Sequence, residues 1–88
     1  MQDTEHTYRD GRYQEHIFAK RLMRERRYAD AALRLHRIED TRSSVPYDAY
    51  LFYGLYTDLE ACYKELFDFE KAYRYAAKRM SLLESFHS

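Results

Sequence analysis

The sequence has few of the residues that favour β-strands. Its 88 residues include one Val, two Ile and four Thr, whereas strands are enriched in β-branched side chains. Proline occurs once and glycine twice, so few positions interrupt a helix. A chain of this length holds one domain with a modest core. These shortages exclude a fold built on a sheet and predict an all-α protein with a single domain over residues 1–88.

Cysteine and long apolar segments are also scarce. The single cysteine, Cys62, has no second cysteine with which to form an internal disulfide, in agreement with a reducing compartment. No apolar run approaches the roughly 20 residues of a membrane span, and the first ten residues, MQDTEHTYRD, lack the features of a signal peptide. We therefore expect a cytoplasmic protein without membrane contact, with Cys62 buried in a helix.

Neither sign of charge is in excess, because 15 Lys and Arg balance 15 Asp and Glu. No overall field draws the chain to nucleic acid or to an anionic membrane. The densest local cluster is Arg21, Arg24, Arg26 and Arg27, which acidic residues interrupt and which lacks interleaved aromatic residues for base stacking. A small regulator that binds nucleic acid through the Arg21 to Arg27 cluster is kept as an alternative.

Aromatic residues are abundant, with ten Tyr and five Phe. They mark several helical segments. Pro46 and the preceding polar loop at 40–46 predict a helix from about Pro46 to about Leu66, with Ser44 as a cap and Asp48 in the first turn. Asp68 then predicts a cap for a last helix from Phe69 to about Phe86.

The N-terminal half has weaker boundaries. Residues 12–42 contain no Pro and no Gly, which would allow one continuous helix. The apolar stripe changes phase, however, between the segment that contains Ile17 and Leu22 and the segment that contains Leu35 and Ile38. We therefore predict a break between Arg24 and Tyr28.

Two stretches, RRYADAALRL and FDFEKAYRYA, share an aromatic residue followed three positions later by alanine. Tyr28 with Ala31 and Phe69 with Ala72 fill these places. The pattern resembles the tetratricopeptide repeat, in which a tight turn is followed by an aromatic residue, two variable positions and a small residue that lets two helices approach. Further matching positions hold Leu35 and Ala76 in the second helices and Leu22 and Tyr63 in the first helices.

The resemblance covers roughly residues 12–86 and departs from the family pattern at named positions. The small residue of the first helix is Ala19 in one copy and Glu60 in the other, and Arg26 and Phe67 replace the turn glycine. The copies are offset by 41 residues (from Tyr28 to Phe69), against 34 in the standard repeat. The resemblance implies two antiparallel hairpins, at about 7–42 and about 46–86.

The resemblance also implies a protein or peptide partner. It places a concave stripe on the first helices, where an acidic peptide or a terminal carboxylate would suit the basic residues. The stripe residues singled out for partner binding are Tyr13, His16, Lys20, Arg24, Thr57 and Lys64. The same stripe also contains Ile17, Gly54, Asp58 and Ala61.

The last helix carries apolar residues around most of its circumference, which predicts a second neighbour. Its main apolar arc, expected to face inward, comprises Phe69, Ala72, Tyr73, Ala76, Ala77, Met80 and Leu83. A second strip, made of Tyr75, Leu82 and Phe86, is expected to dock on another subunit, giving a homo-oligomer, or on further helices.

The sequence contains no recognisable catalytic or metal-binding pattern. His6, His16, His36 and His87 are too far apart for a local ligand cluster, and the two glycines stand alone. We expect neither enzymatic activity nor a cofactor. The leading prediction is an interaction module, either a small adaptor or the repeat segment of a larger cytosolic signalling or regulatory protein. The alternatives are a self-associating structural unit and the nucleic-acid regulator described above.

Overall fold

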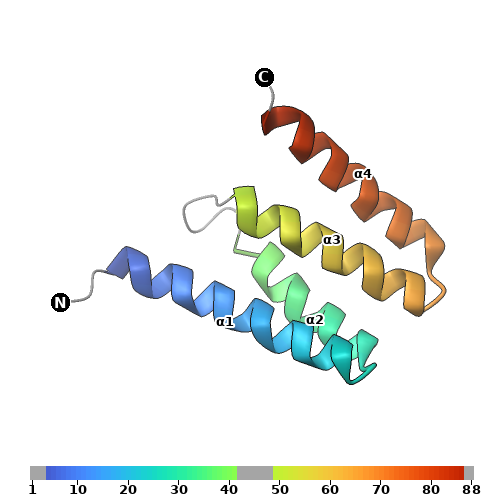
Figure 1. Cartoon of the computed structure of the whole chain (residues 1–88), viewed down its shortest axis with the longest axis horizontal. Coiled ribbons are helices and arrows are strands. Elements are labelled where there is room, and N and C mark those ends of the chain that lie inside the picture. Colours follow the sequence, from blue (N-terminus) through green and yellow to red (C-terminus); the bar gives the residue numbers. More distant parts are fainter. Residues whose placement is uncertain (1–3, 42–48, 87–88) are drawn as a thin grey trace.

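Four α-helices make up the part of the chain that the structure describes. The structure is a computed structural model that describes residues 4–41 and 49–86, with side chains from Gly11 onward. The helices are α1 (Thr4–Arg24), α2 (Tyr28–Glu39), α3 (Ala49–Glu65) and α4 (Phe69–Phe86) (Figure 1). No strand occurs in these residues, so the prediction of an all-α fold is confirmed.

Most predicted helix boundaries are confirmed. α1 ends at Arg24 and α2 begins at Tyr28, where the change in apolar phase predicted a break. α4 extends from Phe69 to Phe86, as predicted. The predicted helix start at Pro46, with Ser44 and Asp48, lies outside the described residues.

Both hairpins turn by the same backbone route, and neither turn contains glycine. Arg26 and Phe67 both have a left-handed backbone, with φ of 63° and 62°. The next N–H in each turn, from Arg27 or Asp68, donates to the carbonyl of Leu22 or Tyr63, at 2.8 Å in both hairpins. This is the Schellman arrangement that ends many helices. The turn geometry is therefore the same in the two hairpins, at the positions where the resemblance expects glycine.

The helices that follow these turns begin differently. Asp68 caps α4, because its Oδ1 accepts a hydrogen bond from the Lys71 N–H at 3.2 Å, as predicted. The equivalent residue before α2, Arg27, makes no side-chain cap bond. Its guanidinium instead pairs with Asp30 at 2.8 Å. A carboxylate therefore satisfies a free N–H of α4, whereas α2 begins without such a cap.

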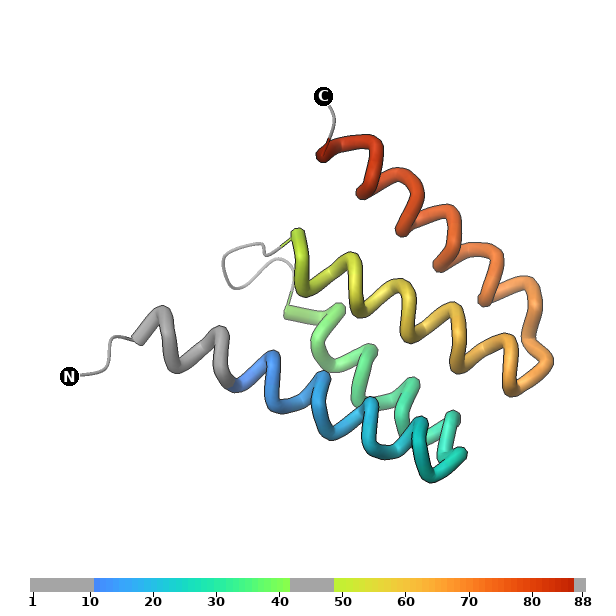
Figure 2. The backbone as a smooth tube through the Cα atoms, viewed as in Figure 1, coloured from blue at the N-terminus to red at the C-terminus, as the bar shows by residue number. Residues whose placement is uncertain are grey.

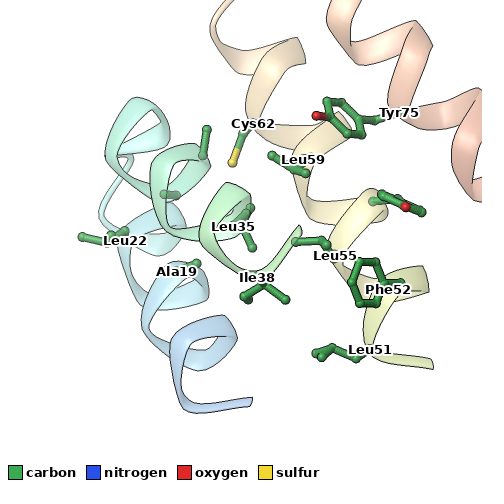
Figure 3. Close-up of a cluster of buried hydrophobic side chains, with 13 residues drawn as sticks. Ala19, Leu22, Leu35, Ile38, Leu51, Phe52, Leu55, Leu59, Cys62 and Tyr75 are labelled. Atoms are coloured by element: carbon green, nitrogen blue, oxygen red, sulfur yellow. The ribbon is translucent and has the colours of Figure 1, made fainter. Parts of the chain in front are cut away.

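A continuous apolar core joins all four helices. Its members come mainly from α2 and α3, with α1 supplying Ala19 and Leu22 and α4 supplying Tyr75 (Figure 3). The remaining members are Ala31, Ala32, Leu35, Ile38, Leu51, Phe52, Leu55, Tyr56, Leu59 and Cys62. Cys62 is buried, as the sequence predicted. The core thus holds the hairpins to each other as well as closing each one.

The two hairpins lie side by side. The most extensive contacts are those of α1 with α2 and α3 with α4, while α2 packs on α3 and α1 touches α3 more lightly. This order leaves α4 at one edge of the array, with no helix of the described residues on its outer flank (Figure 2). The contact between α1 and α3 creates a shared face, on which most of the predicted binding residues lie.

The second hairpin replaces an apolar position of the first with an ion pair. Ala19 and Ile38 are buried in the core, and the residues 41 positions later are Glu60 and Arg79. The Glu60 carboxylate accepts a hydrogen bond from the Arg79 guanidinium and also pairs with Lys64 at 3.1 Å. A carboxylate can therefore occupy the position of the family's small residue, because two cations neutralise it.

Candidate partner-binding face on α1 and α3

The predicted stripe residues occupy neighbouring helices, and the structure brings two of them together around a third. His16 and Lys20 of α1 both contact Asp58 of α3. Arg24, Thr57 and Lys64 are exposed. The face thus has a polar contact at its centre and exposed cations around it.

Asp58 is the centre of the contact between the two first helices. Its side chain is buried, with 7% of the residue exposed, and its Oδ2 lies 2.6 Å from His16 Nε2 and 2.9 Å from Lys20 Nζ. Burial alone would raise the pKa of Asp58, but the hydrogen bonds from His16 and Lys20 outweigh it, so the pKa lies below its ordinary value. Because the carboxylate is ionised, His16 Nε2 carries the proton and donates it in this bond.

Gly54 allows α1 to approach α3 at this point. A Cβ atom at Gly54 would lie 3.1 Å from His16 Cε1, which is tighter than ordinary van der Waals contact. The imidazole therefore lies against the backbone of α3, one turn before Asp58. His16 is buried and committed to Asp58, so it positions α1 instead of offering an open ligand contact.

The other stripe residues have different surroundings. Lys64 pairs with Glu60 at 3.1 Å on its own helix, and Thr57 Oγ1 donates to the Tyr53 carbonyl at 2.9 Å. Arg24 makes no ion pair among the side chains of residues 11–41 and 49–86. Of the predicted cations, Arg24 is therefore the most accessible to an anionic partner.

A second polar cluster, which the sequence analysis did not predict, joins α2 to both helices of the second hairpin. Glu39 Oε1 lies 2.9 Å from His36 Nδ1 and accepts a hydrogen bond from the Tyr75 hydroxyl at 3.1 Å. Lys78 Nζ donates to Glu39 Oε2 at 3.3 Å. His36 Nε2 lies 2.8 Å from the Tyr63 hydroxyl. The hairpins are therefore linked by hydrogen bonds as well as by the core.

The same cluster has shifted pKa values and stacked rings. Burial would raise the pKa of Glu39, but hydrogen bonds from His36, Lys78 and Tyr75 lower it overall. Burial, followed by the nearby Glu39 charge, raises the pKa of Tyr75. The Tyr63 and Tyr75 rings stack at 6.0 Å with 7° between their planes. A buried tyrosine needs a partner for its hydroxyl, which was the one signal in the sequence for such a cluster.

The strip that the sequence analysis predicted for docking, made of Tyr75, Leu82 and Phe86, lies largely against α3. Tyr75 is buried, Leu82 packs against the core, and Phe86 stacks on the Tyr50 ring at 5.5 Å. Tyr75 and Leu82 therefore belong to the face by which α4 packs on α3, whereas Phe86 is still 40% exposed. Part of the arc that was expected to face inward is exposed instead, including Phe69, Tyr73 and Met80.

The arginine cluster lies at the end of α1 and in the following turn. Arg27 pairs with Asp30 and approaches Glu25 at 3.8 Å. Arg26 is exposed and forms the left-handed turn position. Within the described residues no group of His, Cys, Asp and Glu could hold a metal ion. In the same part of the chain, no helix is both long enough and apolar enough to cross a membrane.

Comparisons with known proteins give no match. The chain matches no protein-family model, and no curated protein or solved structure is significantly similar to it.

Proposed function

We propose that this chain is a protein-interaction module of the tetratricopeptide type, and that it binds an acidic segment of a partner protein along the face shared by α1 and α3. The repeat-type packing supports the first part. Ala31 and Ala72, three positions after the aromatic residues, are both buried. Small residues at these positions let the helices of each hairpin approach closely.

The observation that carries the proposal is an exposed cation beside the Asp58 contact. Arg24 is exposed and makes no ion pair among the side chains of residues 11–41 and 49–86, whereas Lys20 pairs with Asp58 and Lys64 pairs with Glu60. Asp58 and Glu60 are held by cations of the chain itself. A carboxylate of the partner segment would therefore form its ion pair with Arg24, which is exposed.

Apolar side chains beside these cations define the partner further. Ile17 is largely exposed and Tyr13 is partly exposed, and both lie on the stripe of α1 that contains Lys20 and Arg24. Tyr50 is exposed on α3. A segment that combines carboxylates with one or two apolar side chains would complement this face, because charge gives register and apolar burial gives affinity.

The test is a selection of random peptides on the immobilised chain. We expect the selected peptides to be rich in Asp and Glu, and Arg24→Glu to weaken their binding at least tenfold. The matched control is Arg74→Glu, which reverses the charge of an exposed arginine on α4. Asp58 and its two partners are left unchanged, so the α1–α3 contact stays intact.

Two outcomes would contradict the proposal. One is a selection that yields no binders or yields peptides without acidic residues. The other is binding that Arg24→Glu and Arg74→Glu weaken equally. If the chain instead bound a nucleic-acid pool, and replacing Arg21 and Arg26 by Ser abolished that binding, the nucleic-acid regulator would replace this proposal.

A further inference from the structure

One face of α4 is open to solvent, although its residues are spaced like those of a packed helix. This open face consists of Phe69, Tyr73, Ala76, Ala77 and Met80. Phe69, Tyr73 and Met80 are 62%, 78% and 51% exposed. At roughly 200 Å² for a whole aromatic side chain, the exposed fractions of the two rings leave about 280 Å² uncovered. With Met80, the open face reaches the size at which exposed apolar patches mark interaction sites.

The equivalent face of α2 is covered by the second hairpin. The residues 41 positions before the open face are Tyr28, Ala32, Leu35, His36 and Glu39, and none of them is exposed. Ala32 and Leu35 are buried in the core. His36 lies 2.8 Å from the Tyr63 hydroxyl of α3, and Glu39 accepts hydrogen bonds from two side chains of α4. A face of this kind therefore receives a helical hairpin elsewhere in the same chain.

The backbone geometry around α4 repeats that around α2. The turns that precede the two helices have the same left-handed residue and the same hydrogen bond. α2 and α4 run in the same direction, and α3 runs antiparallel to both (Figure 1). α3 packs on α2, whereas no helix of residues 4–41 and 49–86 packs on the outer side of α4. A helix antiparallel to α4 would continue the contact that α3 makes with α2.

The side chains of α3 show what such a helix brings to the contact. α3 places a column of leucines in the core at a spacing of four residues, namely Leu51, Leu55 and Leu59. Leu55 lies across from Leu35 of α2 (Figure 3). Because residues four apart lie on the same side of a helix, α3 covers α2 with a stripe of large aliphatic side chains.

The open face of α4 has its own distribution of large and small residues. Its middle is small, because Ala76 and Ala77 lie there, while Tyr73 and Met80 lie on either side along the helix. Facing helices interdigitate when a large side chain of one lies over a small side chain of the other. The middle of the open face therefore accommodates one large apolar side chain from an incoming helix.

Two glutamates beside the open face define the charge of that helix. Glu70 and Glu84 are exposed and make no ion pair among the side chains of residues 11–41 and 49–86, whereas Glu39 and Glu60 pair with cations. They lie on one flank, nearly four helical turns or about 20 Å apart, and the exposed Arg74 lies further round the helix. Basic residues on the incoming helix would complement this flank, and acidic residues would be repelled.

We propose that the open face of α4 binds an amphipathic helix of a partner protein, antiparallel to α4. The helix carries a stripe of large apolar side chains, one of which lies over Ala76 and Ala77. The ring of Tyr73 and the flexible thioether of Met80 pack on either side of that residue. Lysine or arginine residues on one flank of the partner helix pair with the two glutamates. This surface is distinct from the cationic face of α1 and α3.

Selection from a library of helical peptides tests the proposal. Each peptide has roughly 18 residues, because shorter isolated helices are marginal in water. Large apolar residues occupy one stripe, and the flanking positions are either Lys or Glu. The immobilised unaltered chain selects the binders, and those that Arg24→Glu weakens are assigned to the α1–α3 face. We expect the remaining binders to carry Lys on the flank and to bind Tyr73→Glu at least tenfold more weakly.

The matched control is Leu33→Glu, at an exposed apolar position of α2 outside the open face, which should bind these peptides like the unaltered chain. The double variant Glu70→Lys with Glu84→Lys should reverse the preference, so that peptides with Glu on the flank bind at least tenfold more tightly than those with Lys. Circular dichroism checks that every variant keeps its helices.

Four results would overturn the proposal. The first is a selection without any peptide whose binding depends on Tyr73. The second is a set of such peptides with no preference for Lys, and the third is equal weakening by Leu33→Glu. Sedimentation equilibrium of the chain alone supplies the fourth, because a dimer that Tyr73→Glu dissociates would make a second copy of the chain the occupant of this face.

Discussion

Arg26 and Phe67 hold the same left-handed backbone in two separate turns, with φ of 63° and 62°. Each residue ends the first helix of its hairpin, and neither has the conformational freedom of glycine. A side chain in this region costs roughly 1–2 kcal/mol relative to right-handed backbone, because Cβ approaches the following carbonyl oxygen. The two hairpins therefore carry the same local strain.

Replacing either residue with glycine should stabilise the chain. We expect Arg26→Gly and Phe67→Gly each to raise the free energy of unfolding by about 0.5–1 kcal/mol, since relief of strain outweighs the extra freedom of glycine in the unfolded chain. Urea unfolding followed by circular dichroism measures the change. Arg26→Ala, which keeps the Cβ, is the control and should change stability little. A lower midpoint for both glycine variants would show that the turns are not strained.

Removing the charge of Asp58 should weaken the contact between α1 and α3. Asp58→Asn should lower the free energy of unfolding by about 1–3 kcal/mol, because charge-assisted hydrogen bonds to His16 and Lys20 are lost at a buried site. Asp30→Asn, which removes an exposed pair with Arg27, is the control and should cost less than about 1 kcal/mol. Equal effects of the two changes would argue against a structural role for the Asp58 contact.

Acid should destabilise the chain through Asp58 and Glu39. Their pKa values lie below the ordinary values of 3.8 and 4.5. A carboxylate with a lowered pKa in the folded state contributes stability that is fully present above its unfolded pKa and lost as the pH falls through its folded pKa. Urea midpoints measured from neutral pH downward should therefore decline below about pH 4.5. Asp58→Asn should decline less steeply, and an unchanged slope would contradict this assignment.

Two neighbouring tyrosines of α4 should respond differently to loss of the hydroxyl group. Tyr75→Phe should cost about 1 kcal/mol, because the Tyr75 hydroxyl donates to Glu39 in a partly buried cluster. Tyr73→Phe should leave stability unchanged, since Tyr73 is 78% exposed and makes no described hydrogen bond. Thermal or urea unfolding of the two variants gives the comparison. If Tyr73→Phe were instead the more costly change, α4 would pack on α3 through the face that contains Tyr73.

The Cys62 thiol should be unreactive until the chain unfolds. Burial, together with the nearby Asp58 charge, raises the pKa of Cys62 to about 12, and the thiolate is the reactive form. A chromogenic disulfide reagent at mildly alkaline pH should therefore label Cys62 slowly in buffer and rapidly in concentrated urea. Rapid labelling in buffer would show that the second hairpin opens at α3.

Local features of the fold could be predicted from the sequence. The break after Arg24, the cap at Asp68 and the bounds of α4 depend on residues within one or two turns of each other. Capping bonds and helix starts are decided by such near neighbours. The residues that share one face of α1 could also be predicted, because residues four apart lie on the same side of a helix in any fold.

The partners of these faces could not be predicted. The sequence placed His16 and Lys20 on one stripe. It did not show that Asp58, 42 residues after His16, would contact both side chains. On α4 the sequence placed Tyr73 in the arc expected to face inward and Tyr75 in the strip expected to dock, whereas the structure buries Tyr75 and exposes Tyr73. Periodicity counts apolar residues on a face, and it contains no information about which neighbour fits that face.

The sequence by itself therefore determined four helical segments, their turns and their apolar faces, because backbone hydrogen bonds, caps and helical periodicity act over a few residues. Tertiary structure alone decided that Tyr75 points inward and Tyr73 outward. The Tyr75 hydroxyl reaches Glu39, 36 residues away, and its ring stacks on Tyr63. The free energy of these contacts depends on how the two hairpins, which are far apart in sequence, pack against each other. The faces of α4 that contain Tyr75 and Tyr73 have similar apolar spacing, and they differ in whether another hairpin packs on them.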